Sequence, residues 1–334
     1  MDYGRINISF DDYKKPDPIR NKMGKKSVVE LLLVTSIIGL AILGFRYSVD
    51  WIVDLVLQSK LMDYYKDSFV LQEIIQIFFS IFGIMLPFGI AIPFIKLIQP
   101  KTSIIPLDKP KSMGYFKASI PIAFVILILA NFVTAVMFVA IEGIGFSFDE
   151  SEVESPSNVF EFIWEWIAVA LIPALCEEFA IRGVVLQSLR KYGDIFAIVI
   201  SAFLFGVMHG NVTQIPFAFI LGCAMGYFVI KTGSLWTSIA IHLMNNTYAI
   251  IISILTNNLP MVGYLAIAAT INAIGMAIGL LSYVWIRKNK MDTNPVKDKY
   301  VRWQPFVVTI LSPVLIWAIV EVLKVALGTV SYMG

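Results

Sequence analysis

Charged residues are scarce in this chain. Asp, Glu, Lys and Arg make up 15% of its 334 residues, whereas 58% are hydrophobic and the mean hydropathy is +0.78. A soluble domain carries about 25% charged and about 45–50% apolar residues. This deficit excludes a water-soluble fold of this size, and it equally excludes a disordered chain, whose composition is polar and charged. What remains is a membrane protein with several spans.

Cysteine and histidine are also rare, with two residues of each. Cys176 and Cys223 both lie in apolar runs, so we interpret them as small buried hydrophobic residues and expect no disulfide framework. The formal net charge is only +2, so no overall electric field favours a nucleic-acid partner. The composition predicts the lipid bilayer as the first partner, and no feature of the sequence defines an oligomeric state.

The apolar residues gather in about nine runs, each near the roughly 20 residues that a helix needs to cross a bilayer core of about 30 Å. Because no open sheet is stable in lipid, these runs predict an all-α bundle of about eight to nine transmembrane spans. We place the spans at 27–45, 69–95, 118–141, 167–189, 195–210, 212–230, 234–256, 260–286 and 305–327. Two amphipathic stretches, 46–68 and 159–166, predict helices that lie at the membrane surface.

The Lys and Arg residues predict the orientation of the chain in the membrane. Twenty-one of the 26 fall before the first span or in alternate loops, and the positive-inside rule places such segments in the cytoplasm. We therefore expect a cytoplasmic N-terminus and an external C-terminus. The high usage of Lys, Ile and Asn hints at a bacterial source and so at a bacterial cell membrane.

One predicted span contains three ionisable side chains. Such a group inside the membrane costs several kcal/mol, which makes it a candidate functional residue. Glu178 and Arg182 are four residues apart, so they lie on one helix face and predict an ion pair. Glu177 is rotated by about 100° from Glu178 and has no partner nearby in sequence. An ion pair that only fixes helix packing therefore explains two of these residues and leaves Glu177 unexplained.

Both histidines, His209 and His242, also lie in predicted spans, and Asn246 follows His242 by one turn on the same face. At a rise of about 1.5 Å per residue, Glu177, His209 and Asn246 lie about 21–22 Å from the cytoplasmic ends of their helices, and His242 about 16 Å. Packing residues on three separate helices would have no reason to share one depth. The coincidence predicts a common site near or slightly beyond the middle of the membrane.

Two kinds of hydrolysis fit these residue types. A Glu and a His around one water molecule form a general base, while a second His and an Asn carboxamide can donate hydrogen bonds to an oxyanion. Alternatively, Glu177, His209 and His242 are a three-ligand set for a catalytic Zn²⁺ with an open position. The sequence contains no His-Glu-x-x-His helix, and no Ser or Cys has a convincing His partner. Both options hydrolyse an amide inside the membrane.

Three motifs follow one another on successive spans: Glu177-Glu178-x-x-x-Arg182, Phe205-x-x-x-His209 and His242-x-x-x-Asn246. In this order they resemble the motifs of the CAAX protease and bacteriocin-processing family of intramembrane proteases, over about residues 166–250. The resemblance implies a helical membrane domain with a cavity between helices. It also implies endopeptidase activity on a membrane-associated peptide or protein.

The resemblance assigns a role to each motif residue. Glu177 and His209 would activate water, and His242 and Asn246 would stabilise the oxyanion. The supporting residues of the catalytic helix would be Glu178 and Arg182. The choice between a Zn²⁺ cofactor and a Glu-activated water stays open. We accordingly divide the chain into a cytoplasmic segment, N-terminal membrane helices, a catalytic core and C-terminal membrane helices, at 1–26, 27–158, 159–256 and 257–334.

Two other functions compete with the protease. Intramembrane charges and about nine spans are also compatible with a proton-coupled transporter, in which Glu177, Glu178 and His209 relay protons or bind a cation. The lack of internal repeats argues against it. A non-catalytic partner in peptide export or self-immunity would keep the fold without the reaction, although the chain retains every polar residue that hydrolysis needs.

Overall fold

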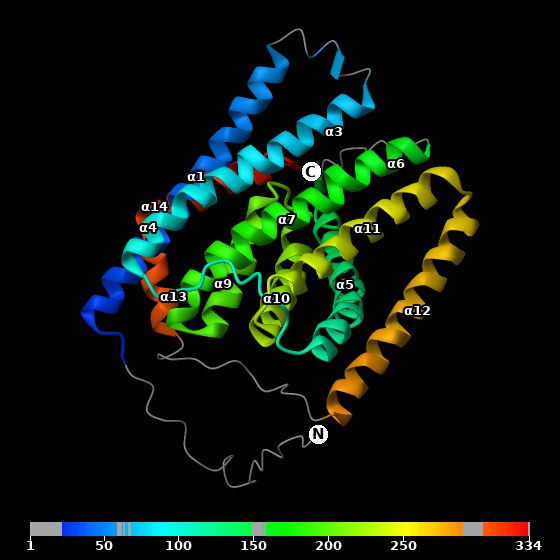
Figure 1. The fold of residues 1–334 in the computed structure, drawn as a ribbon. Coiled ribbons are helices and arrows are strands. Elements are labelled where there is room, and N and C mark those ends of the chain that lie inside the picture. Colours follow the sequence, from blue (N-terminus) through cyan, green and yellow to red (C-terminus); the bar gives the residue numbers. More distant parts are fainter. Residues whose placement is uncertain are drawn as a thin grey trace.

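The computed structural model describes residues 22–58, 62, 64–65, 68–148, 156, 158–289 and 303–332. Most of the predicted N-terminal segment 1–26 thus lies outside the described residues. Nearly all of the described chain is helical (Figure 1). The helices are α1 Lys25–Leu57, α3 Phe69–Phe78, α4 Leu86–Ile98, α5 Met113–Glu142, α6 Val159–Glu165, α7 Ile172–Glu178, α8 Leu186–Leu189, α9 Asp194–Met208, α10 Ile215–Thr232, α11 Trp236–Asn258, α12 Met261–Lys288, α13 Trp303–Ile310 and α14 Pro313–Leu327. Strands β1 Phe146–Phe148 and β2 Val330–Tyr332 form one short antiparallel pair.

The prediction of an all-α membrane bundle is confirmed, and the number of spans among the described residues lies at or just below the lower end of the predicted eight to nine. Among the described residues, seven helices are long and apolar enough to cross a membrane. An eighth span is counted if α13 and α14, which bend by 75° at their junction, are taken together. The predicted span 195–210 corresponds to α9, whose 15 residues reach only about 22 Å, short of a bilayer core of about 30 Å.

Longer helices take up the first part of one predicted surface stretch, 46–68, and the whole of the other, 159–166. Helix α1 runs on to Leu57, through the first part of the stretch 46–68, because Arg46 pairs with Asp50 one turn further on and so offsets the two charges. The stretch 159–166 is the first part of one continuous span, Val159–Tyr192. Asn158 caps its start by accepting a hydrogen bond from the main-chain nitrogen of Glu161.

Small residues set the closest helix contacts. A Cβ atom at Gly279 of α12 would lie 2.3 Å from the main-chain oxygen of Pro121 in α5, and one at Gly39 of α1 would lie 2.8 Å from the main chain of Leu315 in α14. Membrane helices associate through such close packing because lipid supplies no hydrophobic force between them. The pairs α1–α14 and α5–α12 flank the central helices α7, α9, α10 and α11 (Figure 1).

The span Val159–Tyr192 is regular α-helix only in part. Two π-helical turns, Trp166–Leu171 and Phe179–Val185, lie on either side of α7. Each wide turn inserts extra backbone and changes the direction in which the following side chains point, and such turns are common at functional sites. They hold the short helix α7, which ends in Glu177 and Glu178, in the middle of the bundle.

Candidate active site

Three elements supply the residues singled out from the sequence. Glu177 and Glu178 are the last two residues of α7, and His209 follows the last residue of α9 as its C-cap. His242 and Asn246 lie one turn apart in α11. The structure brings Glu177, His209, His242 and Asn246 to the wall of one cavity of about 450 Å³. Their predicted convergence is therefore present in the fold, whereas their catalytic roles stay predictions.

A buried ion pair supports this wall. Nη1 of Arg182 donates to Oε1 of Glu178 at 2.7 Å, and both side chains are 0% exposed. Nη2 of Arg182 donates to the carbonyl oxygen of Gly222 in α10 at 3.3 Å, and the guanidinium lies 4.3 Å from the ring centre of Phe205 in α9. A Cβ at Gly222 would lie 3.2 Å from this nitrogen, so glycine makes room for the contact. Arg182 thus ties three helices together.

Glu178 also holds the buried His242. Nδ1 of His242 lies 2.9 Å from Oε1 of Glu178, the same oxygen that accepts from Arg182. A carboxylate paired with arginine can only accept, so Nδ1 carries the hydrogen. The other ring nitrogen, Nε2, lies 3.8 Å from Oε2 of Glu177. The ring is therefore oriented with Nε2 towards Glu177, whose side chain is 22% exposed and accessible from the cavity.

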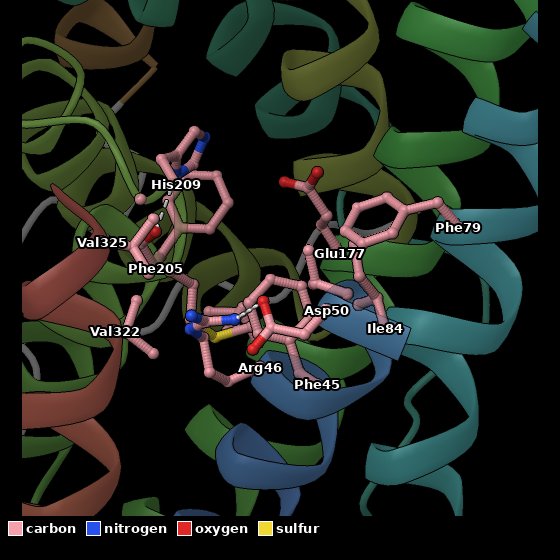
Figure 2. Close-up of a pocket in the computed structure, with 14 residues that line it drawn as sticks. Phe45, Arg46, Asp50, Phe79, Ile84, Glu177, Phe205, His209, Val322 and Val325 are labelled. Atoms are coloured by element: carbon pink, nitrogen blue, oxygen red, sulfur yellow. Dashed lines mark hydrogen bonds and ion pairs between the residues drawn. The ribbon is translucent and has the colours of Figure 1, made fainter. Parts of the chain in front are cut away.

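His209 has a defined tautomer when its ring is neutral. Its Nδ1 lies 2.8 Å from the carbonyl oxygen of Phe205, one turn earlier, and a carbonyl can only accept a hydrogen bond. The hydrogen is thus on Nδ1, and Nε2 keeps a lone pair that can accept a proton. Glu177 and His209 also border a second cavity, in which their side chains come from two different helices (Figure 2).

Asn246 is engaged in this structure. Its Nδ2 donates to the carbonyl oxygen of Val169 at 2.8 Å, and its Oδ1 accepts from Nδ2 of Asn245 at 2.8 Å. Both asparagines line the 450 Å³ cavity. The side-chain amide of Asn246 is accordingly oriented by its neighbours, and its Nδ2 carries a second hydrogen that can donate to an oxyanion.

Two residues at the site had no role in the sequence-based assignment. The Phe205 ring lies 4.7 Å from the ring of His209 and 5.8 Å from the ring of His242, between centres, and so packs against both histidines. The sequence signal for this contact is that Phe205 lies four residues before His209, and so one helical turn away on the same face. Asn245 orients Asn246 through a hydrogen bond, and the sequence indicates this contact only by placing the two residues next to each other.

The residues do not form a metal site as they stand. Within the part of the chain that the structure describes, no group of three or more His, Cys, Asp or Glu side chains is placed to hold an ion. The conditional Zn²⁺ set of Glu177, His209 and His242 is therefore not assembled, and zinc dependence stays a prediction without support from this geometry.

Comparisons with known proteins locate the resemblance in the same segment. No curated protein and no solved structure matches the chain. A family model does match, and the matched segment contains α6 to α10 and the part of α11 that carries His242 and Asn246. The family is described as type II CAAX prenyl endopeptidase Rce1-like, and the match spans residues 159–248, so this part of the chain is similar to Rce1-like proteins.

Proposed function

We propose that this protein is an intramembrane endopeptidase that hydrolyses a peptide bond in a membrane-associated peptide or protein with water activated by Glu177 and His209. The family match supports protease activity in general. One observation supports Glu177 as the base. Its side chain lines the cavity and takes no part in the Glu178–Arg182 ion pair. A carboxylate in that position is available as a base.

The reaction follows from the hydrogen-bonding capacity of each group. Water bound between Glu177 and Nε2 of His209 gives a proton to the Glu177 carboxylate while its oxygen attacks the peptide carbonyl carbon. The tetrahedral intermediate carries a negative oxygen, which accepts hydrogen bonds from Asn246 Nδ2 and from a protonated Nε2 of His242. The C–N bond then breaks, and the proton held by Glu177 passes to the leaving nitrogen.

Glu178 and Arg182 act as positioning residues in this scheme. His242 donates to the oxyanion only as an imidazolium, because its Nδ1 hydrogen is already bonded to Glu178. Glu178 is the counter-charge that this imidazolium needs, and Arg182 holds Glu178 in place. This arrangement gives the second glutamate of the motif a purpose that differs from that of the first.

The proposal predicts that Glu177→Gln lowers kcat for peptide cleavage by about 10²–10⁴-fold, the range of general-base catalysis. The measurement is cleavage of a synthetic peptide mixture by the purified full-length protein, read by mass spectrometry. Glu321→Gln is the matched control, because Glu321 lies on α14, pairs with Lys324 at 2.7 Å and lines neither cavity at the site.

Wild-type turnover by the Glu177→Gln protein would refute the assignment of the base. Loss of wild-type activity with a chelator and its return with Zn²⁺ would favour the metal alternative. Proton flux in proteoliposomes with no peptide cleavage would instead identify a transporter.

A further inference from the structure

A second cavity shares part of its wall with the cavity of the candidate active site. It has a volume of about 330 Å³ and shares Glu177, Phe205 and His209 with the cavity already described. Most of its remaining lining residues come from α1, from the turn Phe79–Met85 and from α14. All three elements lie outside the family match at 159–248. The groups proposed to activate water are thus located where two cavities meet.

The second cavity has the character of a ligand site. Its volume falls within the roughly 300–1,000 Å³ range of such pockets, which are mostly apolar with a few polar groups. Apolar side chains line it from several helices, including Phe45, Phe79, Ile84, Val322 and Val325. Arg46 and Asp50, one turn apart on α1, form an ion pair at the end of this pocket away from Glu177 and His209 (Figure 2).

The ion pair defines what kind of group the cavity accepts. Asp50 already compensates the charge of Arg46. A negatively charged ligand would therefore be disfavoured here. The Arg46 side chain is 21% exposed, so its guanidinium can also donate a hydrogen bond to a neutral carbonyl oxygen of a ligand. The half-exposed Asp50 carboxylate can accept a hydrogen bond from an N–H group.

These features match a short, uncharged and apolar peptide segment, whose main chain offers both a carbonyl and an N–H. An endopeptidase substrate must also extend in both directions from the bond that is cut. We propose that the cavity between α1 and α14 binds the apolar substrate segment on one side of the scissile bond, with Arg46 and Asp50 orienting its main chain. This inference rests on the proposed function and adds the substrate class and a specificity subsite to which helices outside the matched segment contribute.

The test is a change of cleavage specificity in the full-length protein. Val325 lines the cavity and is 39% exposed, so Val325→Phe reduces the space without filling a packed core. We expect a loss of about tenfold or more in kcat/KM for bonds flanked on one side by Leu, Ile or Phe, as is typical of pockets that sense side-chain size. Bonds flanked on that side by Gly or Ala keep their rates, and preferences on the other side are unchanged.

Val320→Phe is the matched control. Val320 lies on the same helix, is 43% exposed and does not line the cavity, so both specificity profiles stay those of the wild type. Arg46→Met supplies a second readout. We expect it to raise KM by about tenfold with little change in kcat, because a hydrogen bond to a charged donor is lost equally from substrate and transition state.

The outcomes separate the two proposals. A wild-type protein that cleaves no peptide in the mixture overturns the proposed function together with this inference. Cleavage by the wild type with a Val325→Phe profile that is unchanged, or reduced equally for all peptides, overturns the subsite alone. A uniform reduction would be expected if the cavity only conducted water to Glu177. A selective loss of cleavage at bonds flanked on one side by large apolar residues supports the subsite.

Discussion

At the scale of single residues, the two adjacent glutamates have different surroundings, and the difference decides what each can do. Glu178 is fully buried and bonded to both Arg182 and His242, so its charge is compensated. Glu177 is partly exposed to the cavity and lies 3.8 Å from His242. A substitution at Glu178 should therefore affect the structure, and one at Glu177 only the chemistry.

We predict that Arg182→Met destabilises the fold by about 3–5 kcal/mol, the cost of leaving a buried charge without its partner. The double variant Glu178→Leu with Arg182→Met leaves no uncompensated charge, so it recovers most of this loss. It stays inactive, because His242 loses the group that orients its ring. Thermal unfolding in detergent and peptide cleavage, measured on the same samples, check both statements. A double variant as unstable as Arg182→Met would contradict this account of the ion pair.

The convergence of Glu177, His209, His242 and Asn246 could be predicted from the sequence, but individual contacts could be predicted only where they lie within one helix. The spacing of Glu178 and Arg182 fixes their pairing within one helix, and that pair is present. The contact of Glu178 with His242 joins residues 64 positions apart, so it depends on how α7 packs against α11. No local pattern contains that information. The engagement of Asn246 with Val169 is likewise visible only in the fold.

At the scale of elements, the packing of α12 depends on the absence of side chains at the contact with α5. We predict that Gly279→Ala destabilises the protein by about 1–3 kcal/mol, because a Cβ only 2.3 Å from the Pro121 oxygen forces the helices apart. Gly263→Ala on the same helix is the control, since its nearest neighbour would lie 3.8 Å away. Thermal unfolding of the two variants tests this prediction, which fails if both shift the midpoint equally.

The positions of the helices were easier to predict than their ends. Long apolar runs located the spans because lipid requires the backbone to be helical there. The ends were wrong where charged residues continue a helix, as Arg46 and Asp50 do in α1 by pairing with each other. The π-helical turns around α7 were not predicted either, since they arise from packing and leave no periodic signal in the sequence.

At the scale of the whole molecule, the orientation in the membrane stays a prediction from the distribution of basic residues. It places Asn258, at the end of α11, outside the cell, and Asn289, just after α12, in the cytoplasm. We predict that Asn258→Cys reacts with a membrane-impermeant maleimide in intact cells, whereas Asn289→Cys reacts only after lysis. Both are made in a background with Ala at Cys176 and Cys223. The opposite labelling pattern would invert the topology.

The segment that matches the Rce1-like family model is flanked by helices that border the candidate site. Residues 159–248 supply Glu177, His209, His242 and Asn246, while α1 and α14 close the second cavity beside them. A peptide bound across both cavities would present its scissile bond to Glu177. The flanking helices therefore contribute to substrate choice in this account, and the central domain contributes the chemistry.

The central claim is that Glu177 activates a water molecule, and the origin of the new carboxyl oxygen tests it most directly. Purified protein cleaves the peptide mixture in water enriched in oxygen-18, and mass spectrometry reads both products. We predict one heavy oxygen in the new C-terminal carboxyl group in a single turnover, no covalent peptide–protein adduct, and cleavage slowed by about 10²–10⁴-fold with Glu177→Gln. An adduct with the protein, or unchanged cleavage by Glu177→Gln, would contradict the account.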